Sequence, residues 1–400
     1  MSFDTPASPL THSASHGQAA AAKDILARLV GFDTVSRNSN LELIAWVEQY
    51  LADHGVASTR IPDETGEKAN LFATIGPADT PGIGLSGHTD VVPVDGQDWD
   101  MDPFVLTEAD GKLYGRGACD MKGYLACVLA AVPSLVERSL KVPVHIVFSY
   151  DEEIGCVGVL PMIAKMGGDF VKPRAVFVGE PTDMTVVDAH KGPCRWNVRL
   201  RGKAVHSSLA HQGVNTITYA GRLLAELDRM EQAFKATPNE RFDPPYTTLQ
   251  VTQIEAGRAS NIVPEDCWFG WEIRGLPGVS ADDVEAELRV VADRLADEMR
   301  ETDPEAGIEI ARSHSVPPFQ ADPDLEALPL ALRLAGTNET FAVAYATEAS
   351  HFEENGIPTV VCGPGNIAQA HTPNEWIEKA ELSKCLRFLD RLGDWCESQS

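Results

Sequence analysis

The chain has 400 residues, of which 44% are hydrophobic and 23% are charged. Its 33 basic and 59 acidic residues give a net charge of −26, which disfavours binding to nucleic acid or to an anionic membrane surface. No apolar run reaches the roughly 18–20 residues that a transmembrane helix needs. We therefore expect neither nucleic acid nor membrane as a partner, and the length is typical of two domains.

The eight cysteines are scattered along the chain and include no C-x-x-C pair. This pattern indicates reduced, mostly buried thiols, as in cytoplasmic proteins. The first twenty residues lack the charged start and the apolar middle of a signal peptide. We expect them to form a polar, disordered leader.

In the first part of the chain, apolar periodicity predicts alternating helices and strands. The helix at 41–54 has a stripe of Leu41, Ile44, Val47 and Leu51, and Gly55 ends it. Strands that alternate with helices favour a parallel sheet covered on both faces. The other expected elements are helices at 20–30, 119–136 and 157–166 and strands at 70–75, 83–85, 144–150 and 175–178.

After Asp188 the pattern changes to strands that alternate polar and apolar residues, as in antiparallel sheets. The expected order is strand 195–201, helix 215–230, strands 247–254 and 267–273, helix 281–299 and strand 308–311, which is the order of a ferredoxin-like α+β module. Further α/β elements are expected at 324–336, 341–345, 359–362 and 378–396. The predicted fold is an α/β catalytic domain with a mixed, mainly parallel sheet (1–188 and 316–400) and an inserted α+β domain (189–315).

Polar side chains follow several of the predicted parallel strands, where ligands bind in open α/β sheets. His88 and Asp90 follow the strand at 83–85, and their spacing puts both on one face. Asp90 could then accept the far ring N–H of His88 and leave the other nitrogen free for a metal. The remaining candidates are Asp151, Glu152, Glu153 and Glu180 after later strands, His371 after the last strand and Asp120 at a helix start.

This set contains imidazoles and carboxylates but no thiolate, which suits Zn²⁺, Co²⁺ or Mn²⁺ in a catalytic site. So many carboxylates in one place would repel each other unless cations offset them. Two divalent ions that share a bridging carboxylate are the simplest interpretation. Taken singly, Asp120 could serve only the helix dipole and Glu152–Glu153 could be solvated surface.

The motifs GHTDVVP, GRGACDMKG, SYDEEIG, GEPT and AHTPNEW, in this order, resemble those of the M20 family of dinuclear zinc amidohydrolases. The resemblance covers nearly the whole chain after the leader. It implies that His88 and Glu180 bind one metal, that Glu153 and His371 bind the other and that Asp120 bridges both. Zn²⁺ is the expected ion, with Co²⁺ or Mn²⁺ as alternatives.

The resemblance also implies roles beyond metal binding. Glu152 is the expected general base. Asp90 joins it as a candidate catalytic residue because its spacing from His88 lets it support that ring. His206, in GKAVHSS, is expected to reach across a homodimer formed through the inserted lid domain and to stabilise the oxyanion. Asn261 and Arg274 match positions that bind polar groups and the carboxylate of the substrate.

The segment YATEAS at 345–350 bears on specificity, because desuccinylase-like members tend to have Asp and Arg there. This chain has Thr347, Glu348 and Ala349 and resembles the members that deacetylate acetylornithine, in which Glu348 could meet the substrate ammonium. The hypothesis is hydrolysis of N2-acetyl-L-ornithine to acetate and L-ornithine, a step of arginine biosynthesis. Alternatives are another M20 hydrolase of small N-acyl amino acids or dipeptides, or a non-catalytic metal-binding protein.

Overall fold

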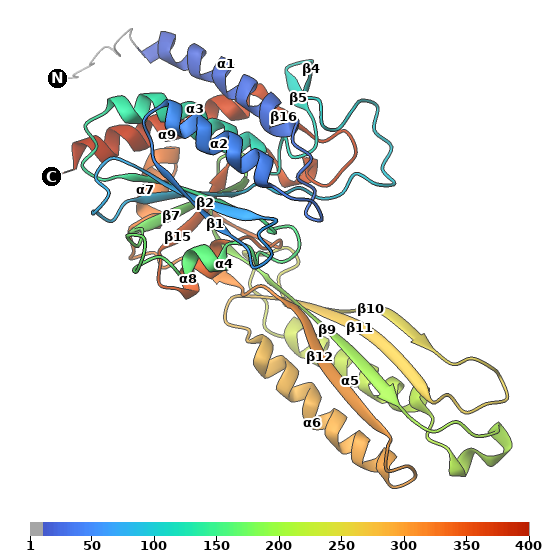
Figure 1. Ribbon diagram of the computed structural model, residues 1–400. Helices are drawn as coiled ribbons and strands as arrows, with labels where there is room; N and C mark the ends of the chain where they lie inside the picture. The colour runs from blue at the N-terminus through green and yellow to red at the C-terminus, as the bar shows by residue number, and fades with distance from the viewer. Residues whose placement is uncertain (1–10, 400) are drawn as a thin grey trace. The chain divides into compact units, whose positions relative to one another are not determined.

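The computed structural model describes residues 11–399 and divides the chain into two compact units (Figure 1). The α/β unit contains the chain up to Asp188, Ala321–Phe341 and the chain from Thr347 onward. The inserted unit contains Ala189–Gln320 and the short segment Ala342–Ala346. The second boundary therefore lies a few residues later than the expected one at 315/316.

The main sheet has strand order β1-β2-β6-β3-β7-β15-β8-β13, with β14 paired to β8. Its centre, β6-β3-β7-β15, is parallel, and the outer pairings are antiparallel, which confirms the predicted mixed, mainly parallel sheet. The strands are β1 (Ser58–Pro62), β2 (Ala69–Ile75), β3 (Ile83–His88), β6 (Val144–Ser149), β7 (Ala175–Pro181), β8 (Val186–His190), β13 (Phe319–Gln320), β14 (Thr340–Val343) and β15 (Thr359–Gly363). A small sheet contains β4 (Thr107–Ala109), β5 (Lys112–Tyr114) and β16 (Trp376–Glu378).

Helices cover both faces of the main sheet, so its central strands are buried at every residue and carry almost continuous apolar runs (Figure 1). One layer contains α1 (Thr11–Val30), α2 (Leu41–Asp53), α3 (Lys122–Glu137) and α9 (Lys379–Ser398). The other face carries α4 (Leu160–Ile163) and α8 (Ala349–Glu354), and α7 (Ala327–Ala335) packs on β15 and β7. The 3₁₀ turn η2 (Ile367–Gln369) follows β15.

The prediction of a disordered leader is wrong for residues 11–20, because α1 begins at Thr11. Four consecutive alanines at 19–22 favour a helix, and Leu26 and Leu29 are fully buried where α1 packs on α3 and α9. Residues 1–10 lie outside the described part of the chain.

Two other predicted details are also wrong. Helix α4 covers only Leu160–Ile163 of the expected 157–166. Just before it, Gly158 packs so closely on Tyr150 that a Cβ atom would lie 1.6 Å from the Tyr150 carbonyl oxygen. In α2, Leu43 replaces Leu41 in the buried stripe. The short strands β1 and β8 were not predicted at all.

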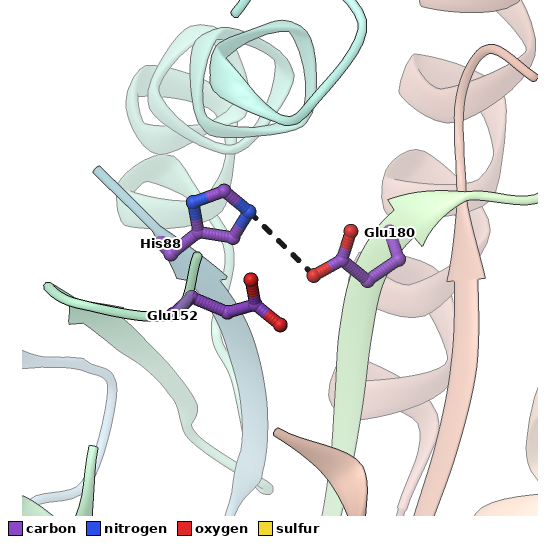
Figure 2. A group of neighbouring side chains, drawn as sticks. All are labelled: His88, Glu152 and Glu180. Atoms are coloured by element: carbon purple, nitrogen blue, oxygen red, sulfur yellow. Dashed lines mark ion pairs between the residues drawn. The ribbon is translucent and has the colours of Figure 1, made fainter. Parts of the chain in front are cut away.

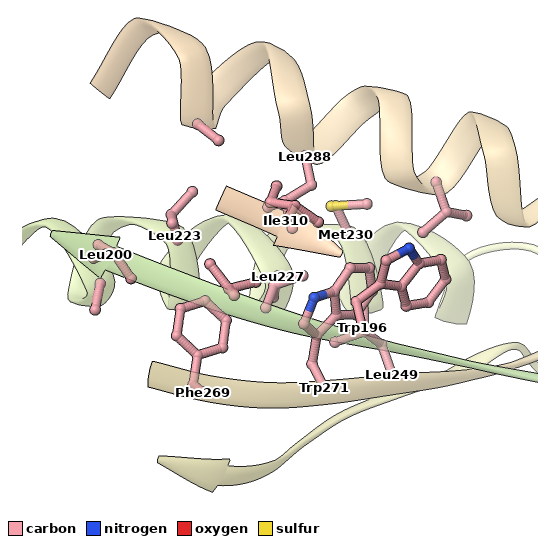
Figure 3. Packing of buried hydrophobic residues seen from close by; sticks show 14 of the residues in the cluster. Trp196, Leu200, Leu223, Leu227, Met230, Leu249, Phe269, Trp271, Leu288 and Ile310 are labelled. Atoms are coloured by element: carbon pink, nitrogen blue, oxygen red, sulfur yellow. The ribbon is translucent and has the colours of Figure 1, made fainter. Parts of the chain in front are cut away.

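The inserted unit has strand order β10-β11-β9-β12, all antiparallel, which confirms the ferredoxin-like module. Its elements are β9 (Gly192–Arg201), η1 (Ser207–Gln212), α5 (Thr216–Lys235), β10 (Thr248–Ala256), β11 (Asp266–Gly275), α6 (Ala281–Arg300) and β12 (Gly307–Ser315). Figure 3 shows its core, in which the indoles of Trp196 and Trp271 stack with centroids 4.1 Å apart. As predicted, Ser280 caps α6 by accepting a hydrogen bond from the Asp283 N–H.

Among the described residues, no helix combines the length and the apolar composition that crossing a bilayer requires.

Candidate active site

The carboxyl ends of three neighbouring parallel strands, β6, β3 and β7, bring the first site residues together. His88 ends β3, Glu180 lies near the end of β7 and Glu152 follows β6. Nε2 of His88 lies 3.6 Å from Oε1 of Glu180. In Figure 2 the His88 ring and the two carboxylates face one common space.

The carboxylate of Asp120 lies between two imidazoles. Its Oδ1 is 3.1 Å from Nε2 of His88, and its Oδ2 is 3.2 Å from Nε2 of His371. Asp120 sits in the loop before α3, where Gly117 adopts a φ of 79° and lies so close to Val91 that a Cβ atom would clash with it. A carboxylate that offers one oxygen to each of two histidines has the arrangement of a bridging metal ligand.

His371 belongs to the loop after η2 and has a φ of 61°, which is uncommon outside glycine. Its Nε2 lies 3.0 Å from Oε2 of Glu153, which is in the loop after β6. The five predicted metal ligands, His88, Asp120, Glu153, Glu180 and His371, therefore lie in one cluster.

Burial has the largest effect on the pKa values of the carboxylates in this cluster. It raises the pKa of Glu152 and of Glu180 well above the usual range and that of Glu153 to about 7. Burial also acts to raise the pKa of Asp120, but hydrogen bonds with His371 and His88 outweigh it and lower that pKa. Protonation is thus one way to relieve the crowded negative charge, and bound cations are another.

The pKa values of the two histidines are raised by the carboxylates that surround them. Hydrogen bonds with Asp120 and Glu153 raise the pKa of His371 to about 10. Burial acts to lower the pKa of His88, but hydrogen bonds with Asp120 and Asp90 raise it well above its usual range. These imidazoles lie where a positive charge is favoured, as is expected at a cation site.

Two groups of side chains have the spacing of metal ligands. Potential ligand atoms lie within 4.8 Å of one another in the group His88, Asp120 and Glu153 and in the group His88, Glu152 and Glu180. In addition, Oε1 of Glu180 is buried and accepts no hydrogen bond within the described chain. An unsatisfied buried carboxylate oxygen costs free energy that a metal–oxygen bond would recover. The residues therefore fit divalent ions.

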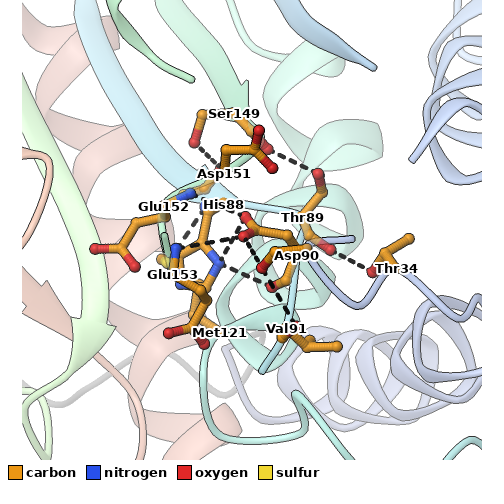
Figure 4. A network of polar contacts seen from close by, with 12 residues as sticks. Thr34, His88, Thr89, Asp90, Val91, Met121, Ser149, Asp151, Glu152 and Glu153 are labelled. Atoms are coloured by element: carbon orange, nitrogen blue, oxygen red, sulfur yellow. Dashed lines mark hydrogen bonds and ion pairs between the residues drawn. The ribbon is translucent and has the colours of Figure 1, made fainter. Parts of the chain in front are cut away.

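Asp90 supports the site differently from the prediction (Figure 4). Nδ1 of His88 lies 2.9 Å from the main-chain oxygen of Asp90, and its distance to the Asp90 carboxylate is 3.5 Å. The Asp90 carboxylate instead accepts hydrogen bonds from the Ser36 hydroxyl and from the N–H groups of Glu152 and Glu153. Asp90 thus orients the His88 ring mainly through its carbonyl and fixes the glutamate loop through its side chain.

Glu152 is held separately from its neighbour Glu153. The Cys156 thiol donates to its Oε1 at a distance of 3.1 Å, and the carboxylate faces His88 and Glu180 (Figure 2). Glu153 points instead to His371. Adjacent glutamates therefore serve different parts of the cluster, which is consistent with one metal ligand and one proton carrier.

Comparison with known sequences decides the family. Residues 84–394 match the sequence model of peptidase family M20/M25/M40. The matched segment spans more than half of the chain and includes the whole cluster. The chain belongs to the M20 family. Members of this family are metal-dependent hydrolases, so the family assignment and the ligand cluster agree.

Several curated relatives of this M20 chain carry the same name. A protein of Myxococcus xanthus named acetylornithine deacetylase is 35% identical over 372 residues, which cover 92% of this chain and 95% of the relative. A protein of the same name from Salmonella arizonae is 36% identical over 344 residues, 85% of this chain and 87% of the relative.

Solved structures share the fold of this M20 chain at lower identity. The M20 metallo-carboxypeptidase of Sulfolobus solfataricus superimposes with a TM-score of 0.76 at 19% identity and covers 94% of this chain and 99% of its own. Aminopeptidase PepT of Bacillus cereus gives 0.75 at 21% identity and covers 94% and 98%. A Bacillus subtilis member described as a dinuclear metal-binding peptidase gives 0.67 at 18% identity and covers 96% and 98%.

Three predicted substrate-contacting residues belong to the inserted unit of this M20 chain. His206 is exposed and precedes η1, and its Nδ1 accepts a hydrogen bond from the Ser208 N–H. Asn261 lies close to His206, because the main-chain carbonyl of Asn261 accepts a hydrogen bond from the N–H of Ser207, the residue after His206, at 2.9 Å. Arg274 is half-buried on β11, 3.7 Å from Glu272. Their roles at the metal cluster stay predictions.

Glu348, by contrast, lies in the same unit as the cluster and is 1% exposed. Its Oε2 is 3.4 Å from the hydroxyl of Ser86 on β3, and its Oε1 has no hydrogen-bond partner in the described chain. Burial raises its pKa to about 7. Glu348 is therefore a buried acid that contacts Ser86 of β3, the strand that carries His88.

Sequence reasoning gave no role to three residues that support the cluster: Gln97, Arg116 and Glu375. Arg116 and Glu375 lie inside the recognised motifs GRGACDMKG and AHTPNEW. Their opposite charges could have indicated that the two motifs form an ion pair. Only the tertiary structure shows that they pair, with Nη1 of Arg116 2.8 Å from Oε2 of Glu375.

Proposed function

We propose that this chain hydrolyses N2-acetyl-L-ornithine to acetate and L-ornithine, with two divalent ions in the cluster. The position of Asp120 carries this proposal, because its two oxygens face His88 and His371 separately. The names of the curated relatives support the substrate. The reaction is a step of arginine biosynthesis.

In this proposal His88 and Glu180 hold one ion, Glu153 and His371 hold the other and Asp120 is shared. Zn²⁺ suits a site of imidazoles and carboxylates, and Co²⁺ or Mn²⁺ could replace it. When bound, such ions lower the pKa of a water molecule and polarise the scissile carbonyl.

Glu152 carries the proton in the proposed reaction. It takes a proton from the attacking water as the new C–O bond forms at the acetyl carbon. It then passes that proton to the nitrogen as the C–N bond breaks, which releases acetate and the free amine. Burial and the Cys156 contact keep its carboxylate in place between the steps.

The substrate contacts are proposed from four residues. Nδ1 of His206 accepts the Ser208 N–H, which puts the ring proton on Nε2, the donor that an oxyanion needs. Asn261 and Arg274 bind the polar groups and the carboxylate of the amino acid. The unpartnered Oε1 of Glu348 meets the side-chain ammonium of ornithine.

We also propose a homodimer formed through the inserted unit. Strand β10 ends the sheet order and has one neighbour, β11, within the described chain, so its other edge can pair with a second copy. Val251 and Ile254 on this strand are 38% and 53% exposed, which gives the edge an apolar character. The proposed location is the cytoplasm, where the eight free cysteines would stay reduced.

A substrate panel tests the function. The purified chain is stripped of metal, reloaded with Zn²⁺ or Co²⁺ and assayed with N2-acetyl-L-ornithine, N-succinyl-diaminopimelate, N-acetyl-L-methionine and a dipeptide. The proposal expects the highest kcat/KM with acetylornithine and no turnover in the stripped protein. A higher kcat/KM for the dipeptide or another acyl amino acid would reassign the substrate within the family. Full activity without metal would overturn the mechanism.

A further inference from the structure

The carboxylate of Glu375 is buried against the loop that ends at Asp120. Both it and its partner Arg116 have side chains that are 1% exposed, and Nη1 of Arg116 lies 2.8 Å from Oε2 of Glu375. The same carboxylate accepts hydrogen bonds from the main-chain N–H groups of Gly117 at 3.0 Å, Cys119 at 2.8 Å and Asp120 at 3.0 Å. One side chain therefore fixes the backbone of the loop that carries the shared ligand.

The same side chains also hold the loop of His371. Gln97 donates from Nε2 to the main-chain oxygen of His371 at 2.9 Å, and its Oε1 accepts from Arg116. Nε1 of Trp99 donates to the same Gln97 Oε1 at 3.1 Å, and the Trp99 ring lies beside the guanidinium of Arg116. Gln97, Arg116 and Glu375, which we call the loop clamp, thus connect the backbone at His371 to the backbone at Asp120.

The two halves of the cluster depend on this clamp to different degrees. His88 lies on β3, where it pairs with Ser149 of β6, and Glu180 lies on β7, between residues that pair with β15. Asp120 and His371 lie in loops, outside any helix or strand. A metal site tolerates displacements of only roughly 0.5 Å, so loop ligands need support that strand ligands already have.

Burial of the Arg116–Glu375 ion pair is a costly way to stabilise the fold alone. Removing two charges from water costs several kcal/mol per ion in general, and apolar pairs of similar volume are often as stable. The three N–H groups that Glu375 satisfies all belong to the segment that leads to Asp120. The pair is thus arranged to orient that segment.

We propose that Gln97, Arg116 and Glu375 are positioning residues that set the affinity of the ion held by Asp120, Glu153 and His371. The inference rests on the proposed function in requiring two ions at this site. Loss of the Gln97 side chain frees the His371 carbonyl and lets its loop shift, while the strand-borne ligands of the other ion stay in place.

Metal titration of the full chain tests this. Chelator-stripped wild type, Gln97→Ala and Glu375→Gln are titrated with Co²⁺ by calorimetry, the visible Co²⁺ spectrum is recorded at each step, and circular dichroism checks the fold. The matched control is Gln49→Ala, which removes an exposed glutamine of α2 that donates a hydrogen bond to Asp53. Outer contacts of metal ligands typically alter affinity by about 10–100-fold.

We expect wild type and Gln49→Ala to bind two ions. Gln97→Ala should bind the second ion about 10–100-fold more weakly with the first unchanged. Glu375→Gln should weaken the second ion to a similar degree and should also weaken the first, because it loosens the loop of the shared ligand Asp120. If Glu375→Gln does not fold, Gln97→Ala decides. Two ions bound with wild-type affinities in Gln97→Ala would overturn the clamp alone. Fewer than two ions in wild type would overturn the two-ion centre itself, and the clamp with it.

Discussion

Glu153 and His371 are 218 positions apart in the chain, yet Oε2 of Glu153 lies 3.0 Å from Nε2 of His371. One follows β6 and the other follows β15, so the contact closes the cluster across the sheet. Both groups have a pKa above the usual range, to about 7 for the carboxyl and about 10 for the imidazole. Protons and metal ions therefore compete for the same place.

Removal of metal is expected to make stability depend on pH. Burial raises the folded-state pKa of Glu152, Glu153 and Glu180, which favours their neutral forms in the folded state. Hydrogen bonds with carboxylates raise the pKa of His371 to about 10, so its stabilising proton is present at low pH.

Both effects have the same sign between pH 5 and pH 9. A group with a raised folded-state pKa loses its favourable contribution as pH rises through that pKa. The stripped protein should therefore lose thermal stability on going from pH 5 to pH 9, and added Zn²⁺ should raise Tm more at pH 8 than at pH 6. Thermal melts with chelator and with Zn²⁺ at several pH values measure this. An equal Zn²⁺ effect at every pH would contradict it.

Glu152→Gln is expected to keep both metals and to lose activity. The amide has nearly the same shape as the carboxylate but cannot carry the proton, and general acid–base catalysis contributes about 10²–10⁴-fold. Metal content and kcat are measured together, with exposed Glu64→Gln as the matched control. Normal turnover in Glu152→Gln would show that Glu152 is not the general base. Loss of metal from this variant would show that Glu152 is a metal ligand.

Glu348→Gln is expected to reduce discrimination among substrates. A hydrogen bond to a charged group is worth about 1.5–3 kcal/mol, so kcat/KM for acetylornithine should fall by about 10–150-fold. N-acetyl-L-methionine, which has no side-chain ammonium, is the control substrate and should be affected little. A parallel loss with both substrates would indicate that Glu348 supports β3 through Ser86 instead of binding the ammonium.

His206 gives a test of the dimer proposal. His206→Ala and Glu152→Gln should each be nearly inactive, but a mixture of the two variants should recover activity after subunit exchange. A mixed dimer has one site with both groups intact if His206 acts on the partner subunit. No recovery in a mixture shown to exchange subunits would place His206 in its own subunit's site or outside the reaction.

The sequence by itself determined the order of the longer helices and strands, the ferredoxin-like module and the residues that gather at the strand ends. These follow from local patterns: apolar runs make β3, β6 and β7 buried, and alternation gives β9 one apolar and one polar face. Parallel strands then bring their carboxyl ends to one edge, which places His88 near Glu180.

Only the tertiary structure decided which side chains meet. It placed Asp120 between His88 and His371, paired Arg116 with Glu375, buried Glu348 and gave the Nδ1 atom of His88 a carbonyl partner. It also extended the first helix to Thr11. Such contacts join segments that are distant in sequence and depend on loop geometry to fractions of an ångström, so no local pattern of residues encodes them.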